Sequence, residues 1–326
     1  MQKFLFKIFL IVICTVAASC SGSQARQTDD GATAYAERGA FSADSAFAYV
    51  AAQVEFGPRV PGTTAHDDCA TWLVEKLYGS GADTVTVVGE PVTAWNGTKL
   101  PVKNILARFG GKSEGRPLLL VAHYDTRPWA DEDPDPKARL KPFDGANDGA
   151  SGVAVILEIA RNLGLEAPEI PVDILLTDVE DYGSSGIDDS WCLGSVQFAQ
   201  SLPYKPGMGP RWGILLDMVG GKDARFPKEY FSTLHASAPV AKIWDMAGRL
   251  GLRNRFPTST GGAITDDHLP LIGAGIPVAD IIETNSPATG SFPPTWHTRA
   301  DNLDNIDRSA LGDVGRVVLN VIYNEK

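Results

Sequence analysis

The sequence predicts an α/β fold, a single domain with a mostly parallel central sheet that helices cover on both faces. Two observations support this prediction. Strand-like apolar runs alternate with amphipathic helical segments, the pattern of parallel strands joined by helical crossovers. No internal repeat and no Pro/Gly-rich linker divides the 326-residue chain after residue 40, so one domain is expected over 41–326.

Helices are expected at five segments whose apolar residues recur with helical spacing. In the third segment, Val153, Ile156 and Leu157 share a face with Ala160 and Leu163. The five segments are 42–53, 63–78, 152–163, 239–250 and 308–323.

Six short apolar runs predict the strands, because such runs suit a sheet that is covered on both faces. They are 85–88, 104–108, 117–122, 172–177, 212–216 and 276–282. Long loops rich in Pro, Gly and Asp are expected at 130–149, 183–190, 203–210, 221–228 and 284–295. Loops of this length in a compact domain often carry function.

The composition is that of a globular protein, with 44% hydrophobic and 21% charged residues. The formal net charge is -11, and no basic stripe offsets it. Nucleic-acid phosphates would be repelled by such a surface, so we expect no nucleic-acid partner.

The first 19 residues predict an export signal. Lys3 and Lys7 precede a short apolar run at 8–16, and small residues then lead to Cys20. This ending resembles the lipobox of bacterial lipoproteins, which implies cleavage before Cys20 and acylation of its thiol. An ordinary secretory signal cut nearby is the alternative, and both place the protein outside the cytoplasm.

Residues 20–40 are small and polar and predict a flexible tether. The chain is therefore expected to be an exported lipoprotein that faces the periplasm or the cell surface and contacts the membrane only through the anchor at Cys20. Two further cysteines, Cys69 and Cys192, remain in the predicted domain. These two cysteines could form one disulfide or remain as two buried free thiols. The sequence contains no C-x-x-C pair, so a cysteine zinc site is not expected.

Acidic and imidazole side chains follow three of the predicted strands. His123 and Asp125 follow 117–122, Asp178, Glu180 and Asp181 follow 172–177, and Asp217 follows 212–216. Ligands of open α/β sheets gather beyond the carboxyl ends of the strands, so these side chains are expected in one cleft. Like charges in a cleft repel one another unless a cation neutralises them, which predicts a metal site.

The available ligands are imidazole and carboxylate, which fit zinc in a nitrogen and oxygen environment, and another divalent metal is the alternative. The candidates are His123, Asp148, Asp181, Asp217 and His297. Asp148 directly precedes the helix expected from Gly152, so a helix cap is the alternative for that residue. His297, in the loop beyond the last strand, could alternatively be a surface or structural histidine.

Five motifs together resemble the zinc-dependent M28 peptidase superfamily, in order and spacing over about 41–326. They are AHYDTRP, DGANDGASGVAVILEIAR, TDVEDYG, LLDMVGG and TWHTRADNLDNID. Within that superfamily the chain is similar to the glutaminyl-peptide cyclotransferases of animal and bacterial type. The distinguishing residues are Trp129, Trp191, Trp296 and the triplet Asp266-Asp267-His268.

The resemblance implies an acyltransferase that converts the N-terminal glutamine of peptides or proteins to pyroglutamate and releases ammonia. It also implies that Asp148, Asp181 and His297 hold one zinc ion per chain, with Asp181 where many relatives have Glu. Glu180 would shuttle the proton, and His123 with Asp125 would form a network that orients the site.

For the remaining acids, the resemblance implies that Asp217 and Asp267 share a hydrogen bond and that Asp267 orients the substrate amide. The alternative for Asp266 and Asp267 is a helix cap near His268. Trp191 and Trp296 would hold the aliphatic stem of the glutamine. Trp129 is expected with them in the pocket wall, where each tryptophan alone could instead be core packing.

Two other functions stay open. A dinuclear zinc aminopeptidase would use the same five ligand-type residues, with His123 as a ligand and Glu180 activating a bridging water. A lipoprotein that binds peptides or metal without turnover is the second. Glu180 argues against it, because binding alone requires no proton shuttle.

Overall fold

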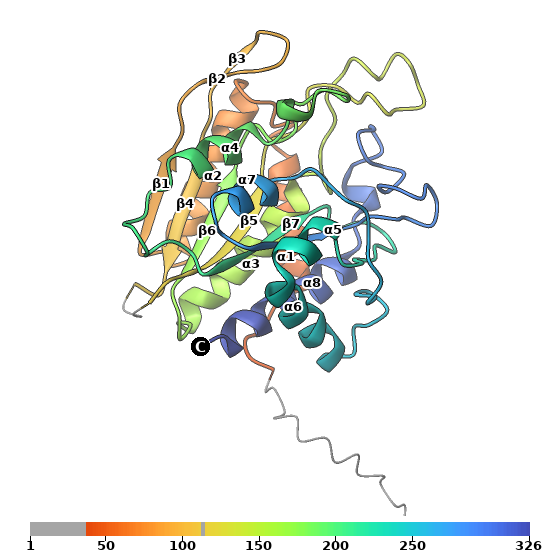
Figure 1. The fold of residues 1–326 in the computed structure, drawn as a ribbon. Helices are drawn as coiled ribbons and strands as arrows, with labels where there is room; N and C mark the ends of the chain where they lie inside the picture. The colour runs from red at the N-terminus through yellow and green to blue at the C-terminus, as the bar shows by residue number, and fades with distance from the viewer. Residues whose placement is uncertain (1–36, 112–114) are drawn as a thin grey trace, which may run out of the picture. The chain divides into compact units, whose positions relative to one another are not determined.

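A six-stranded mixed sheet with the order β1-β4-β6-β5-β7-β8 forms the centre of the computed structural model (Figure 1). The structure describes residues 37–111 and 115–326. The predicted signal peptide and most of the predicted tether lie outside these residues. The described end of that tether is ordered, because Arg38 N donates to Asn320 Oδ1 at 2.9 Å and Ala40 N to Asn162 Oδ1 at 3.0 Å.

Three parallel pairings build the half of the sheet that carries the site. β5 pairs in parallel with β6 and β7, and β7 pairs in parallel with β8. β4 is antiparallel to β6, and β1 is antiparallel to β4. The strands are β1 Thr84–Val88, β4 Asn104–Phe109, β5 Leu118–His123, β6 Val172–Thr177, β7 Trp212–Asp217 and β8 Val278–Ile282, and a small hairpin joins β2 Val92–Thr93 to β3 Lys99–Leu100.

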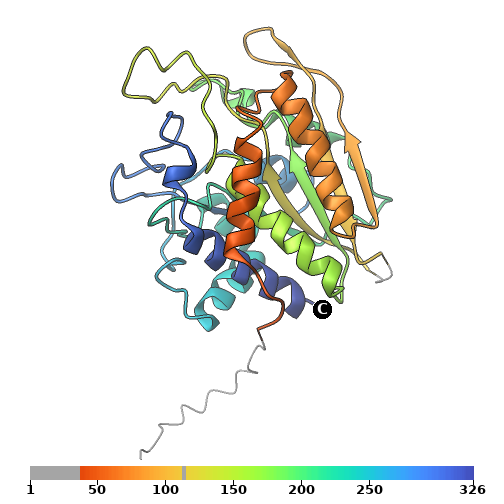
Figure 2. The ribbon, with the colours of Figure 1, turned by 180° about the vertical axis from the view of Figure 1, so that it is seen from behind.

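Helices cover both faces of the sheet, as Figures 1 and 2 show. One face carries α3 Ala150–Leu165, packed between α1 Ala43–Val54, α2 Thr64–Gly79 and α8 Arg308–Asn324, with α6 Ser237–Arg249 beside α8. The other face carries α4 Leu193–Gln200 and α7 His268–Gly273, and α5 Tyr230–His235 contacts α6, α7 and β8. The α/β prediction is thereby confirmed.

The larger core lies between the sheet and the α3 face, and a smaller one lies under α4 and α7. Helix α3 lies very close to β7, because a Cβ atom at Gly152 would come within 2.0 Å of the Leu216 carbonyl oxygen. Only glycine permits this contact, which brings the N-terminus of α3 to the end of the sheet.

The predicted elements are present with boundaries that differ by a few residues. We did not predict α4, α5, β2 and β3. For α7 we expected only a helix-like start near His268. All are too short to show a periodic pattern, since the longest, α4, has 8 residues. In the ranges that the structure describes, no helix has the length and apolar character to cross a membrane.

Candidate active site

The predicted site residues meet at the carboxyl ends of β5, β6 and β7. His123 is the last residue of β5, Asp217 is the last residue of β7, and Asp181 lies four residues beyond β6. Asp148 immediately precedes Gly149, the N-terminal cap of α3, and its carboxylate does not cap that helix. All four side chains are buried, so four ionisable groups lie together with little exposure to solvent.

The three predicted zinc ligands lie together. One atom each from Asp148, Asp181 and His297 falls within 4.8 Å of the others. His297 Nε2 is 3.2 Å from Asp181 Oδ1 and 3.6 Å from Asp148 Oδ2.

This trio fits a metal ion on two grounds. Asp181 Oδ2 is buried and has no hydrogen-bond partner among the described residues, which a cation would provide. Burial alone would lower the pKa of His297, but Asp181 and Asp131 raise it to about 9. The acidic surroundings that favour a proton on this imidazole would equally favour a metal cation.

His297 is also oriented as a metal ligand requires. Its Nδ1 lies 3.3 Å from Asp131 Oδ1, so the carboxylate holds the ring while Nε2 faces the other acids. Asp131 is itself held by Arg127, whose Nε and Nη2 donate to the two carboxylate oxygens at 2.8 and 2.7 Å.

A second group of possible ligands shares Asp148 with the first. His123 Nε2 lies 3.2 Å from Asp148 Oδ1 and 3.2 Å from Asp217 Oδ1. The arrangement has the ligand types for a second metal, and it equally serves as a hydrogen-bonded support for the first.

Asp125 fixes the backbone that carries Glu180 and Asp181. Its Oδ1 accepts a hydrogen bond from Glu180 N at 3.1 Å, and its Oδ2 accepts one from Asp181 N at 3.2 Å. The preceding residue, Val179, has φ of 53°, a conformation that is unfavourable for a β-branched side chain. Such strain is found where surrounding contacts hold a functional group in position, as Asp125 does here.

Glu180 lies beside the trio and opens to the pocket. Burial raises the pKa of Glu180 well above its ordinary value, and the neighbouring acids Asp266 and Asp181 add to this. The Cys192 thiol donates a hydrogen bond to Glu180 Oε1 at 3.2 Å. Cys192 and Cys69 are both buried free thiols, so the structure favours free thiols over a disulfide.

A pocket of about 370 Å³ opens over these residues. Trp191 and Trp296 line it, together with Phe292, Ile282 and Met218. The Trp296 ring stacks on the His297 ring with centroids 3.7 Å apart, and the Trp191 ring lies 6.3 Å from the same imidazole. A flat apolar group next to the metal trio would therefore lie between aromatic walls.

The expectation for Trp129 is wrong in its placement. Trp129 does not line this pocket but packs edge-on against Tyr182, with centroids 5.3 Å apart, and against Trp95 at 6.4 Å. The Arg127 guanidinium lies 5.1 Å from its ring, so Trp129 supports the arginine that holds Asp131. The position of Trp129, six residues beyond β5, gave no signal to separate these two roles.

The structure places Asp266 in the pocket lining, where we expected Asp267. Asp266 lines the pocket, and one ligand atom each of Asp266, Glu180 and Cys192 lies within 4.8 Å of the others. The Oδ2 atom of Asp266 is buried and has no hydrogen-bond partner among the described residues. Asp267 is fully buried and accepts a hydrogen bond from Thr177. Asp267 is the N-terminal cap residue of α7, but its side chain makes no capping bond.

Three supporting residues were missing from the predicted site. Asp131 lies in an acid-rich run after β5, Cys192 follows Trp191, and Asp301 follows His297. Asp301 accepts hydrogen bonds from Asn147 N at 2.7 Å and Asp148 N at 3.0 Å, and so fixes the backbone of a predicted ligand. The acid-rich run after β5 was the available signal for Asp131, and the acids that follow His297 were the available signal for Asp301. No sequence signal indicated Cys192.

Comparison with known proteins identifies a family and its solved members. Residues 104–322 match the model of peptidase family M28. The crystal structure of Bacteroides thetaiotaomicron glutaminyl cyclase, bound to N-acetylhistamine, has 46% identity and a TM-score of 0.84, covering 88% of this chain and 99% of that one.

Two further relatives carry different names. A Zn-dependent exopeptidase from Parabacteroides distasonis has 47% identity and a TM-score of 0.84, covering 89% of this chain and 100% of that one. The glutaminyl-peptide cyclotransferase of Bos taurus is 25% identical over 288 residues, which cover 80% of this chain and 76% of that protein.

Proposed function

This chain belongs to peptidase family M28, and we propose that its site converts the N-terminal glutamine of peptides to pyroglutamate with release of ammonia. The chain is a zinc-dependent glutaminyl-peptide cyclotransferase. The observation that carries this function is the pair of carboxyls, Glu180 and Asp266, that face the aromatic pocket in addition to the metal trio.

Asp148, Asp181 and His297 would hold the zinc ion. When bound, zinc acts as a Lewis acid toward the side-chain carbonyl of the glutamine and favours attack at its carbon. Two carboxylates and one imidazole would be three protein ligands, the number that is usual at catalytic zinc sites.

Glu180 moves the proton. The substrate α-amine forms a bond to the side-chain amide carbon, and the bond from that carbon to its own NH₂ group breaks. Glu180 accepts the proton that the α-amine loses and gives it to the departing nitrogen, which leaves as ammonia. Its raised pKa suits both halves of this transfer.

Asp266, together with Asp217, takes the role that we expected for Asp267. Burial raises the pKa of Asp266 well above its ordinary value, and the nearby carboxylate of Asp217 adds to this effect. The acid can therefore hold a proton and still present an oxygen to the amide NH₂ group.

The two tryptophans exclude water. Trp191 and Trp296 enclose the aliphatic stem, which matters because water at the same carbon would give glutamate instead of the ring. The reaction is intramolecular, so a pocket that holds the folded conformer can lower the barrier by about 7 kcal/mol or more.

Incubation of the purified protein with a Gln-peptide, followed by mass measurement, tests this function. A loss of the mass of ammonia is expected. Loss of the whole first residue would instead identify the second candidate, a dinuclear aminopeptidase, which the second ligand group of His123, Asp148 and Asp217 favours.

The same proposal includes export. A lipoprotein signal ending at Cys20 would place the domain outside the cytoplasm, where it meets secreted peptides and proteins. The support is the sequence pattern at 3–20 alone. Fractionation of cells that express the full chain tests it, because Cys20→Ala should move the enzyme from the membrane to the soluble fraction.

A further inference from the structure

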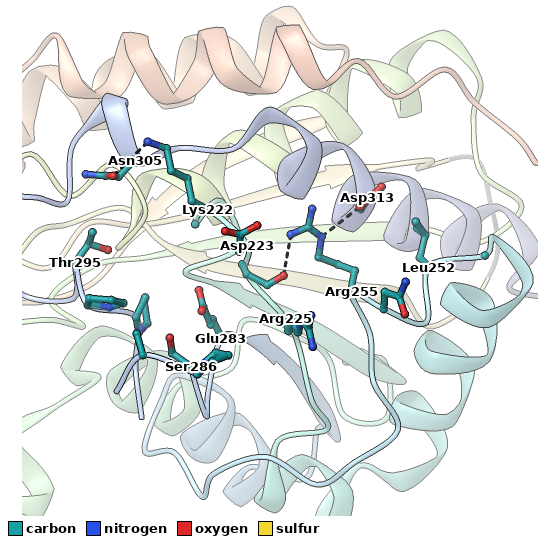
Figure 3. A pocket seen from close by; sticks show the side chains of 18 residues that line it. Lys222, Asp223, Arg225, Leu252, Arg255, Glu283, Ser286, Thr295, Asn305 and Asp313 are labelled. Carbon is teal, nitrogen blue, oxygen red and sulfur yellow. Dashed lines mark hydrogen bonds and ion pairs between the residues drawn. The ribbon is translucent and has the colours of Figure 1, made fainter. Parts of the chain in front are cut away.

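A second cavity shares a loop with the substrate pocket. Figure 3 shows the side chains that line this cavity. The segment 284–296 forms part of both, because Ser291, Phe292 and Trp296 line the substrate pocket and Ser286 and Thr295 line the cavity. The cavity has a volume of about 790 Å³. This falls in the range of about 300–1,000 Å³ that is usual for small-molecule sites.

An unpaired carboxylate points into the cavity. Glu283, directly after β8, is 4% exposed, and its Oε2 has no hydrogen-bond partner in the described chain. Figure 3 shows its side chain directed into the space between Ser286 and Asp223. Burial raises the pKa of Glu283 to about 7, and Asp223 adds to this effect. A buried carboxylate without a partner is costly, so a partner from outside would be bound favourably.

Among the described residues, three cations line the cavity, of which Lys222 and Arg225 are exposed and Arg255 is engaged elsewhere. Arg255 donates to Asp313 at 3.2 Å, to Asp307 at 3.3 Å and to the Ala224 carbonyl oxygen at 2.8 Å. Lys222 Nζ lies 3.5 Å from Asn305 Oδ1. Figure 3 shows this contact and the hydrogen bond from Arg255 to Asp313. Arg255 attracts Glu283 through space but makes no hydrogen bond to it.

The surroundings suit an organic cation better than a metal ion. None of the possible metal groups found among the described residues includes Glu283, so the cavity lacks the several close anionic ligands that a metal requires. An ammonium or guanidinium group needs only one carboxylate and a few neutral acceptors, which Ser286 and Thr295 offer. We infer that this cavity binds an organic cation, an ammonium or guanidinium group, with the Glu283 carboxylate as its counter-ion.

Two sources supply this chemistry. One is a lysine or arginine side chain of the peptide substrate itself, which rests on the proposed function. The other is a free amine that binds apart from the substrate. Either occupant would contact the 284–296 segment, whose other residues line the substrate pocket.

Calorimetric titration with agmatine, which carries both an ammonium and a guanidinium group, tests the site without using activity. Glu283→Gln keeps the shape of the side chain and removes the charge. We expect at least about a tenfold weaker Kd in this variant, and no change in Glu75→Gln, an exposed glutamate on α2. The inference would be overturned if the wild type did not bind agmatine, or if Glu283→Gln bound it with equal affinity. It would also be overturned if the wild type bound calcium and Glu283→Gln did not, because the cavity would then be a metal site.

Turnover separates the two sources. If the substrate supplies the cation, the wild type should show a several-fold lower KM for Gln-Ala-Ala-Arg than for the same peptide with neutral citrulline, and Glu283→Gln should lose this preference. If the cation is free, the two peptides should react alike and agmatine should change the turnover of Gln-Ala. Should Gln-Ala itself not react, the proposed function fails, while the titration still decides the cavity site.

Discussion

Asp266 and Asp267 are consecutive residues, but their carboxylates lie in different surroundings. Asp266 lines the substrate pocket beside Glu180, whereas Asp267 accepts a hydrogen bond from Thr177 at the end of β6. Only the first of the two faces the position where a glutamine amide would react.

This placement predicts different effects of two matched variants. Asp266→Asn should lower kcat/KM by about 30- to 1,000-fold, which corresponds to about 2–4 kcal/mol, with zinc still bound. Asp267→Asn should lower the melting temperature and leave turnover within a few-fold of wild type. Both quantities should be measured on both variants. Normal turnover in Asp266→Asn with severe loss in Asp267→Asn would restore the original assignment.

Glu180→Gln should keep the fold and the metal but lose most activity. The amide is nearly the same size as the carboxylate but cannot accept and return the proton, and general acid–base groups contribute about 10²–10⁴-fold. Steady-state kinetics with a Gln-peptide, together with metal analysis, measures the effect. Activity within a factor of about three of wild type would remove Glu180 from the mechanism.

Metal content distinguishes the two enzyme hypotheses. We expect one tightly held zinc per chain, because the cyclisation uses only Asp148, Asp181 and His297 as ligands. Elemental analysis of the purified protein measures this number. Two equivalents that are both required for activity would show that His123 and Asp217 bind a second ion, as in the aminopeptidase.

Much of the site was predictable because strand ends in a parallel sheet must meet. Asp181 and Asp217 follow apolar runs that predicted buried strands, and these strands, β6 and β7, both pair in parallel with β5, so the two acids lie at the same edge of the sheet. The topology did not decide whether Asp266 or Asp267 faces the pocket. Both precede a six-residue helix, and the direction of each side chain depends on how α7 packs on α4. Glu283 also directly follows an apolar strand, but the sequence did not indicate its cavity, since the cavity is lined by segments that lie far apart in the sequence.

The tryptophans should separate into binding and supporting residues. Trp296→Ala should raise KM for a Gln-peptide at least tenfold, because its ring lines the pocket and stacks on His297 at 3.7 Å. Trp129→Ala should mainly lower the melting temperature, because its ring packs against Tyr182 and Arg127 outside the pocket. Kinetics and thermal unfolding of both variants check this. A large KM effect in Trp129→Ala alone would return that residue to the pocket wall.

Glu283 should make stability depend on pH in a direction that its environment fixes. Its pKa rises from 4.5 to about 7 on folding, so between these values the folded protein binds a proton that the unfolded chain has lost. This stabilising contribution is complete below about pH 4.5 and is lost as the pH rises through about 7. Above pH 7 the folded protein holds a buried charge that the unfolded chain solvates freely.

Glu283→Gln removes that charge and should therefore be more stable than the wild type at pH 8, by about 1–3 kcal/mol, a melting-temperature gain of a few degrees. At pH 5 the gain in the free energy of unfolding should be only a few tenths of its value at pH 8, because the wild-type carboxyl is then protonated in the folded protein. Thermal unfolding at both pH values, with the exposed Glu75→Gln as control, measures the difference. An equal gain at the two pH values would mean that the effect comes from packing, because a titrating Glu283 must make it larger at pH 8.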